Sequence, residues 1–312
     1  MPGSGAPAFL GPAEFVRSGE ALRLAWAPGD ARAYTRWLAT HHYENFHVVS
    51  FLLPKRLHQD FYNVYAYCRW ADDLGDEIGD RAESLRLLEW WRGELDAMYQ
   101  GRATHPVFVA LGPTVRRYGI PPEPFQDLIA AFVQDQIVSR YPDWDSVFDY
   151  CRRSANPVGR LVLHLCGYAD AGRQRLSDAT CTALQLANFW QDVTVDALKD
   201  RVYLPLDLLA RHGYTVEELF ARRFNRAFRE AMREAVDQAR RLFLEGLPLA
   251  GMVDRRLALD LDLFSRGGMR VLEKIEQRGY DVLSARPTVS RSDRVRLLLG
   301  SLARAAFRRA AR

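Results

Sequence analysis

Two aspartates spaced four residues apart stand in a helical segment of this chain, and the same spacing occurs again much further along. The first pair, Asp72 and Asp76, falls in a run from 54 to 79 whose apolar residues recur every three or four positions, which predicts one long helix. The second pair, Asp192 and Asp196, falls in a similar helical run. On a helix, residues i and i+4 project from one face with Cβ atoms about 5–6 Å apart. The chain between the pairs is long enough to bring two such helices face to face across a cavity.

Carboxylates held this closely indicate a cation site. They repel each other unless a cation lies between them, and one or two carboxylates suit Mg²⁺ that keeps water and binds substrate phosphate. Arg69 lies one turn before Asp72 and can reach the same space, as expected for a phosphate site. A solvated acidic helix end is the alternative for either pair alone, because acidic clusters are common. The second pair favours the interpretation as a metal–diphosphate site.

Helical periodicity continues through most of the chain and strand-like alternation is absent, which predicts an all-α fold. No Gly/Ser-rich or charged linker divides the middle of the chain, and we therefore expect one domain. The pair Asn156-Pro157 predicts a helix kink, because proline removes a hydrogen bond and clashes with the preceding turn. Helix starts are predicted at Pro106, Pro122 and Ser177-Asp178, and helix ends at Gly167, Gly213 and Gly279.

Composition restricts the location and the partners. The net charge is +4 over 312 residues and 48% of residues are hydrophobic, which is ordinary for a globular protein and does not indicate a nucleic-acid partner. The four cysteines lack Cys-x-x-Cys spacing and predict reduced thiols in a cytoplasmic protein. The first residues lack signal-peptide character, and no run reaches the roughly 18–20 apolar residues of a membrane span. Any membrane contact is therefore expected to be peripheral, on the inner face of the cell membrane.

Four motifs occur in order along the chain. They are Tyr65-x-x-x-Arg69-x-x-Asp72-Asp73-x-x-Asp76, Tyr150-Cys151-x-x-Ser154-Ala155-x-x-Val158-Gly159, Gln185-x-x-Asn188-x-x-x-Asp192-x-x-x-Asp196 and Arg201-x-Tyr203-Leu204-Pro205. In order and spacing they resemble the squalene and phytoene synthase family of head-to-head isoprenoid synthases, and the resemblance covers about residues 44–287. It implies a single-domain isoprenoid synthase helical bundle around a central cavity, in which two aspartate-rich helices bind Mg²⁺ and an isoprenoid diphosphate.

Within this family, Glu44-Asn45-Phe46 and the segment 154–160 are most similar to the hydroxysqualene synthases of bacterial hopanoid synthesis. That resemblance implies Mg²⁺-dependent conversion of presqualene diphosphate to hydroxysqualene, with loss of diphosphate and capture of water. One alternative is condensation of two farnesyl or geranylgeranyl diphosphates to presqualene diphosphate, squalene or phytoene. Another is a non-catalytic assembly factor with this fold, although such a protein has no reason to keep four mutually repelling carboxylates.

The resemblance also assigns roles to individual residues. The ring of Tyr150 is expected to steady a carbocation by cation–π attraction, the alternative being an ordinary core tyrosine. Two interpretations remain for Gln134 and Asp135: they line the substrate cavity, or they belong to a solvated face of their helix. Basic residues after the second pair are expected to reach diphosphate oxygens. The implied catalytic residues are Tyr65, Arg69, Tyr150, Asp72, Asp76, Asp192 and Asp196, the four last also being the metal ligands, and the substrate-binding residues are Arg69, Gln134, Asp135, Gln185, Asn188, Lys199, Arg201 and Tyr203.

Several features leave their interpretation open. Lys199-Asp200-Arg201 stands where relatives carry a basic residue, a glycine and an arginine, so the shape of this loop is not predicted. The histidines at 41, 42 and 47 lack metal-ligand spacing, and a diphosphate or lid contact is favoured for them over a metal site. Gly267-Gly268 leaves room for the water that a hydroxylated product requires, or permits close helix packing.

The predicted organisation is an N-terminal extension (1–30, partly flexible), a catalytic domain (31–288) and a basic C-terminal helix (289–312). This last segment is rich in arginine and carries a single acidic residue, Asp293. It predicts either an interfacial helix that binds anionic lipid or a packed terminal helix with a solvated basic face.

Overall fold

The computed structural model describes residues 9–18, 25–41, 54–290, 293, 297, 300 and 301. Within these residues every regular element is a helix and no strand occurs, which confirms the predicted all-α fold. None of the helices in this part of the chain is both long and apolar enough to cross a membrane. By its internal contacts the chain divides into two compact units, Met1–Gln136 and Ile137–Arg312, each of which is described by itself. The domain boundaries expected near residues 30 and 288 stay predictions.

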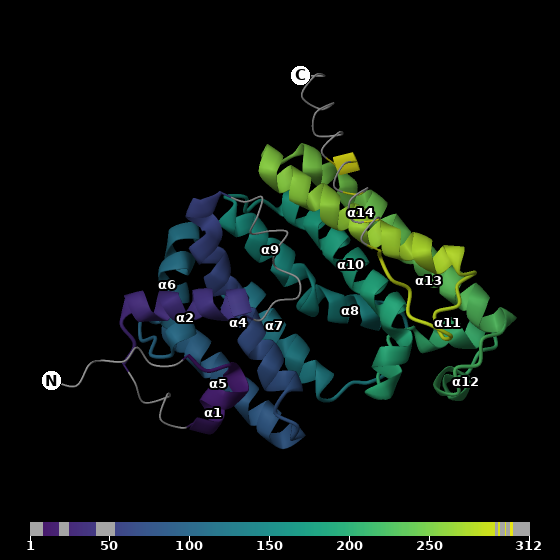
Figure 1. Cartoon of the computed structure of the whole chain (residues 1–312), viewed down its shortest axis with the longest axis horizontal. Helices are drawn as coiled ribbons and strands as arrows, with labels where there is room; N and C mark the ends of the chain where they lie inside the picture. The colour runs from purple at the N-terminus through teal and green to yellow at the C-terminus, as the bar shows by residue number, and fades with distance from the viewer. Residues whose placement is uncertain are drawn as a thin grey trace. The chain divides into compact units, whose positions relative to one another are not determined.

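The first unit is organised around α4 (His58–Asp76), which follows the short 3-10 helix η2 (Lys55–Leu57) and confirms the helix predicted between 54 and 79. Tyr67 and Trp70 of α4 are fully buried, and Trp70 stacks on Trp91 with 5.1 Å between ring centroids. The other helices of this unit are α1 (Pro12–Ser18), α2 (Pro28–His41), α5 (Arg81–Tyr99), α6 (Pro106–Tyr118) and α7 (Glu123–Asp135), of which α2, α5, α6 and α7 all pack on α4 (Figure 1).

Part of the predicted N-terminal extension belongs to this core. Phe15 of α1 is 1% exposed and packs edge-on against Trp70, with ring centroids 5.2 Å apart. Because a buried aromatic side chain contributes a large apolar area, α1 is held on the unit by its own side chain. Near the C-terminal end of α4 the charged side chains differ in exposure: Asp76 is exposed, Arg69 and Asp72 are partly exposed, and Asp73 is buried.

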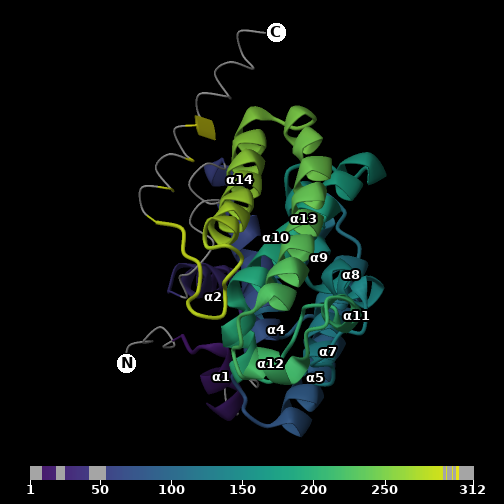
Figure 2. The ribbon, with the colours of Figure 1, turned by 90° about the vertical axis from the view of Figure 1, so that its right-hand side faces the viewer.

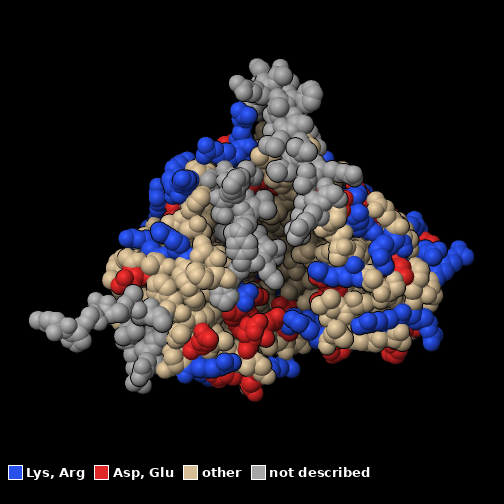
Figure 3. Space-filling model, viewed as in Figure 1, with Lys and Arg blue, Asp and Glu red and all other residues tan. Residues whose placement is uncertain are grey.

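The second unit is organised around α10 (Ala171–Leu198), a helix of 28 residues. It packs against α9 (Asn156–Leu165), α13 (Arg226–Gly246) and α14 (Arg255–Gln277), and both ribbon views show α13 and α14 side by side (Figures 1 and 2). The remaining helices of this unit are α8 (Trp144–Ser154), α11 (Leu206–Arg211), α12 (Val216–Phe220) and η3 (Leu247–Gly251). In the face shown in Figure 3, Lys and Arg side chains are mixed with Asp and Glu side chains.

Glycines allow the helices of this unit to approach one another closely. A Cβ atom on Gly159 of α9 would lie 2.4 Å from Ser177 Oγ, and one on Gly246 of α13 would lie 2.1 Å from Thr180 Oγ1. A Cβ atom on Gly268 of α14 would lie 2.2 Å from Phe243 Cζ. These contacts support the packing alternative for Gly268, whereas a Cβ atom on the neighbouring Gly267 would meet nothing within 4 Å.

The predicted helix boundaries are largely confirmed, with one error. Helix α6 begins at Pro106 and α7 follows Pro122, while Gly167, Gly213 and Gly279 adopt positive φ angles beyond the ends of α9, α11 and α14. The predicted start at Ser177-Asp178 is wrong, because α10 begins at Ala171 and is capped by the Asp170 side chain, which accepts from Arg173 N. Ser177 is instead buried against α9, where its small side chain permits the close approach.

The predicted kink at Asn156-Pro157 is a complete break between helices. Helix α8 ends at Ser154 and α9 begins at Asn156, with proline in the first turn of α9. Proline is tolerated there because the first backbone N–H groups of a helix have no partner within it. The Asn156 side chain is buried and accepts a hydrogen bond of 2.9 Å from the Thr182 hydroxyl of α10, which fixes the break against the long helix.

The start of the predicted C-terminal helix is packed on α14. Asp293 is 4% exposed, accepts from the Ser290 hydroxyl at 2.7 Å and pairs with Arg270 at 2.7 Å and Lys274 at 3.3 Å. Ser301 is also buried. The pKa of Asp293 is lowered by the hydrogen bond from Ser290 and by that from Arg270. These contacts support the packed alternative for the start of the segment; residues 302–312 lie outside the described residues.

We expect Gly268→Ala and Gly267→Ala to change stability in opposite directions. The added methyl at Gly268 meets Phe243 and Leu184, and overpacking of this kind costs about 1–3 kcal/mol. At Gly267 it meets nothing, and alanine is favoured over glycine in a helix by roughly 0.5–1 kcal/mol. Denaturant unfolding of the two variants checks this, and equal stabilities would contradict the close packing of α14.

A second prediction concerns Asp260 of α14, which is 1% exposed and whose carboxylate oxygens have no hydrogen-bond partner among the described residues. Burial, with a smaller contribution from the charge of Asp254, raises the pKa of Asp260 to about 8. Between its pKa in the unfolded chain, about 3.9, and this value, the folded chain binds more protons. The contribution of Asp260 to stability therefore falls as pH rises through this range, by up to roughly 1.4 kcal/mol per pH unit, and is constant above it.

The measurement is the unfolding free energy of Asp260→Asn relative to the unaltered chain from pH 4 to pH 9. The relative stability of the variant should increase up to about pH 8 and then level off. Asp96→Asn, which removes an exposed carboxylate of α5, is the control and should show no such trend. A pH-independent difference for Asp260→Asn would mean that this carboxyl group is ionised in the folded protein.

Candidate functional site

Arg69 and the aspartates of α4 form an ion-pair cluster at the C-terminal end of that helix. The guanidinium of Arg69 lies 2.6 Å from Asp73 Oδ1 and 3.6 Å from Asp72 Oδ2. The Asp73 side chain is 6% exposed and that of Asp72 is 47% exposed. Asp73 therefore anchors the guanidinium from the protein side, while Asp72 and Asp76 remain accessible to a ligand.

The charges in this cluster are influenced by burial. Burial raises the pKa of Asp73 to about 6, an effect that the Arg69 guanidinium opposes. Burial likewise raises the pKa of the Tyr65 hydroxyl, and Arg69 again acts in the opposite direction. The predicted residues Tyr65, Arg69 and Asp72 thus share one electrostatic environment on one helix. Asp73, which was quoted in the motif without a role, is the residue that fixes the arginine.

Gln134 and Asp135 lie at the C-terminal end of α7, which packs on α4. The next residue, Gln136, donates from Nε2 to the carbonyl oxygen of Gly75 at 3.0 Å. This hydrogen bond places the end of α7 beside the acidic end of α4. Both predicted residues are partly exposed, and so their position agrees with a polar wall next to Asp72 and Asp76.

The second aspartate pair lies near the C-terminal end of α10, with Asn188 one turn and Gln185 two turns before it on nearly the same stripe. Asn188 is exposed, and Gln185, Asp192 and Asp196 are partly exposed. The predicted helix and its accessible polar face are therefore both observed.

Arg286, which has no predicted role, pairs with Asp192 through two hydrogen bonds. Its Nε donates to Asp192 Oδ1 and its Nη2 donates to Oδ2 at 3.0 Å. The hydrogen bond with Asp192 raises the pKa of Arg286, and the charges of Asp192 and Asp196 act in the same direction. Gln191 Nε2 donates to the carbonyl oxygen of Pro287 at 2.6 Å. The segment 286–287 is therefore attached to two adjacent residues of α10, Gln191 and Asp192.

Tyr150 and Tyr203, predicted from separate motifs, meet in an aromatic cluster. Tyr203 stacks on Phe189 of α10 with ring centroids 3.7 Å apart and ring planes 4° apart. Tyr150 lies 5.8 Å from Tyr203 and 6.1 Å from Phe189 between centroids, and Tyr141 lies 5.5 Å from both tyrosines. All four rings are less than a tenth exposed. Phe189 and Tyr141 were not predicted, although Phe189 directly follows Asn188 in its motif.

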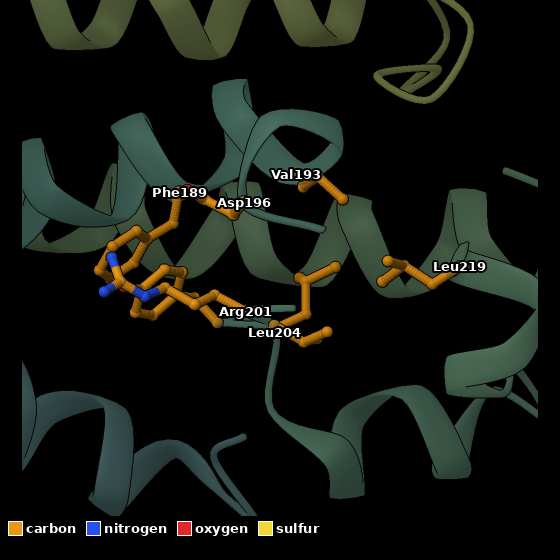
Figure 4. A pocket seen from close by; sticks show the side chains of 8 residues that line it. Phe189, Val193, Asp196, Arg201, Leu204 and Leu219 are labelled. Carbon is orange, nitrogen blue, oxygen red and sulfur yellow. The ribbon is translucent and has the colours of Figure 1, made fainter. Parts of the chain in front are cut away.

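A small hollow joins the acidic end of α10 to this cluster. Asp196, Arg201, Phe189 and Tyr203 line it, and it encloses about 210 Å³ of empty space, part of which is open to solvent. Figure 4 shows that Phe189, Val193 and Asp196 come from α10, while Arg201 and Leu204 come from the segment after it. A carboxylate, a guanidinium and aromatic rings thus line one hollow.

The carboxylates present suit a divalent-cation site of the open kind, in which water supplies most of the ligands. Each aspartate pair supplies hard carboxylate oxygens at i, i+4 on an accessible helix face, which suits a cation that keeps most of its water. Within neither unit do three or more described His, Cys, Asp or Glu side chains gather into a closed metal cage. His41 packs its ring against Trp37 and bonds to the Trp37 carbonyl oxygen, so its contacts in the structure are local. His42, Glu44-Asn45-Phe46 and His47 lie outside the described residues.

The helical fold, the two acidic pairs beside arginines and the aromatic cluster define a protein of the isoprenoid synthase class. The model of the squalene/phytoene synthase family matches residues 39–293, and the chain belongs to that family.

Three relatives show how close this membership is. A hydroxysqualene synthase from Rhodopseudomonas palustris is 36% identical over 251 residues, which cover 79% of this chain and 84% of the relative. A phytoene synthase from Thermus thermophilus is 33% identical over 86% of this chain and 91% of the relative. The crystal structure of the squalene synthase HpnC from Alicyclobacillus acidocaldarius matches with a TM-score of 0.77 at 44% identity, over 80% of this chain and 95% of that structure.

Proposed function

We propose that this protein converts presqualene diphosphate to hydroxysqualene, with loss of diphosphate and capture of water. The observation that carries the proposal is that each accessible aspartate pair has an arginine beside it: Arg69 lies 3.6 Å from Asp72, and Arg201 lines a hollow with Asp196. The 36% identity to a hydroxysqualene synthase supports the choice of reaction within the family.

In this proposal Asp72 and Asp76 on α4, and Asp192 and Asp196 on α10, hold Mg²⁺. When bound, Mg²⁺ supplies positive charge that neutralises the diphosphate and makes it a better leaving group. Basic side chains add hydrogen bonds to the diphosphate oxygens as negative charge develops on them. The residues assigned to this role are Arg69, Lys199 and Arg201.

The aromatic cluster is assigned to the carbocation. The carbon–oxygen bond to diphosphate breaks with its electron pair leaving on the diphosphate, and a water oxygen then bonds to the rearranged cation and releases a proton. The ring faces of Tyr150 and Tyr203 attract a cation by about 0.5–2 kcal/mol. Because both rings are less than a tenth exposed, they stand in surroundings that exclude bulk water, which delays quenching.

Condensation of two isoprenoid diphosphates is the second candidate. It uses the same carboxylates and arginines, and it is favoured by the 33% identity to a phytoene synthase over most of both chains. A non-catalytic assembly factor is disfavoured, because carboxylate pairs that are exposed or partly exposed on one helix face, such as Asp72 and Asp76, cost electrostatic repulsion that a protein without diphosphate chemistry has no reason to keep.

We expect Asp72→Asn or Asp192→Asn to abolish turnover and to leave the fold intact. Each substitution removes the charge of a metal ligand from a partly exposed position, and the ion pair with Arg69 or Arg286 that it weakens contributes no more than about 1 kcal/mol there. Product formation and thermal unfolding are measured together, with Asp207→Asn, an exposed carboxylate of α11, as the control. Near-normal turnover at saturating Mg²⁺ in either variant would exclude the two-pair site.

Arg286→Gln should strengthen binding of a divalent cation at the second pair. The guanidinium now occupies both oxygens of Asp192, and removing a positive charge at this distance favours another cation. Titration with Mn²⁺, followed by electron paramagnetic resonance without substrate, measures this affinity. Arg233→Gln, which breaks an exposed ion pair on α13, serves as the control. Weaker Mn²⁺ binding by Arg286→Gln than by the control would show that Arg286 supports the metal site instead of competing with it.

The product oxygen distinguishes the two candidate reactions. If water captures the cation, presqualene diphosphate should give a C30 alcohol without nicotinamide, and the alcohol should carry ¹⁸O when the reaction runs in ¹⁸O-labelled water. Mass spectrometry of the extracted lipid checks both points. Squalene formed only on addition of NADPH, or presqualene diphosphate accumulating from farnesyl diphosphate, would favour the condensation reaction.

A further inference from the structure

The loop that follows α10 carries an L-residue in a conformation that favours glycine. Asp200 has a φ of +56°, in the left-handed region. Asp200 N bonds to the Ala197 carbonyl oxygen at 3.1 Å and Arg201 N bonds to the Asp196 carbonyl oxygen at 2.9 Å. This pair of hydrogen bonds is the Schellman ending of a helix, in which the left-handed residue is usually glycine. The ending ties the backbone of Arg201 directly to that of Asp196.

The Arg140 side chain makes two hydrogen bonds to Asp200, the residue in the left-handed conformation. Its guanidinium donates from Nη1 to the Asp200 carbonyl oxygen and from Nη2 to the Asp200 carboxylate. The guanidinium also lies over the Phe220 ring, 5.2 Å from its centroid, and 27% of the Arg140 side chain is exposed. A planar guanidinium with several fixed donors suits this double recognition of one residue.

The backbone around Arg140 is fixed to the same loop. Val202 N donates to the Ser139 carbonyl oxygen at 2.9 Å, and a parallel bridge pairs Arg140 with Val202. Leu206 N continues the pairing with the Tyr141 carbonyl oxygen at 2.9 Å. The segment 139–142 is therefore a rigid base from which the Arg140 side chain reaches the loop.

We propose that Arg140 is a positioning residue for Arg201. By binding both the carbonyl and the carboxylate of Asp200 it stabilises the left-handed conformation at 200, and through the helix ending this fixes Arg201 at the hollow that Asp196 lines. The proposal rests on the proposed function in one respect, that Arg201 binds the diphosphate. Arg140 itself has no part in that binding.

The test uses Arg140→Gln, Asp200→Gly and the double variant in the full chain. Glycine adopts positive φ without strain, so Asp200→Gly removes the need for the arginine. The first readout is the rate of trypsin cleavage after Arg201, which reports the order of the loop whatever the protein catalyses. The second is calorimetric affinity for inorganic diphosphate in the presence of Mg²⁺. Thermal unfolding shows that each variant is folded, and Arg233→Gln controls for the loss of a surface arginine.

Arg140→Gln alone should accelerate cleavage and weaken diphosphate binding by about tenfold, as expected for loss of charged hydrogen bonds. In the Asp200→Gly background the same substitution should change both readouts much less, since coupled residues are not additive. Equal effects of Arg140→Gln in both backgrounds, or unchanged cleavage, would overturn the proposal. If the unaltered chain does not bind diphosphate, the proposed function fails, and the cleavage rates still decide whether Arg140 holds the loop.

Discussion

Close approach between the long helices is the constraint on which the second unit depends. Gly159 of α9 and Gly246 of α13 remove side chains where these helices contact α10, and Gly268 removes one where α14 contacts α13; at each point a Cβ atom would lie within 2.5 Å of a neighbouring atom. Packed interiors of this kind tolerate little change of volume, and so they hold a helix in one position. With one side fixed in this way, α10 presents Asp192 and Asp196 on a rigid surface, which a site for a charged ligand requires.

The carboxylates of the site are balanced by guanidinium groups within their own unit. Asp73 anchors Arg69 at 2.6 Å on α4, and Arg286 pairs with Asp192 on α10. Such pairs offset the repulsion between neighbouring carboxylates, and they keep arginines where a diphosphate would need them. A cation that binds at Asp192 therefore has to compete with Arg286, so metal affinity depends on the chain around the aspartates as well as on the aspartates themselves.

The aromatic residues and the basic loop are joined by one short stretch of irregular backbone. The segment 139–142 pairs with the chain after α10, and Tyr141 stacks on Tyr203, which in turn stacks on Phe189. The loop that carries Arg201 and the rings assigned to the carbocation therefore share a support. A change in this support would be expected to affect diphosphate binding and the shape of the apolar surface together.

The sequence alone determined the helical fold class, the two aspartate pairs and their faces, and the residues of four motifs, because helical periodicity and i, i+4 spacing are local properties of the chain. It could not place a helix start at Ser177 correctly, since this serine is used for packing against Gly159 instead of capping. Only the tertiary structure showed that Arg286 meets Asp192 and that Arg140 meets Asp200, pairs separated by 94 and 60 residues. No local pattern encodes such pairs, because they form only when packing brings distant segments together.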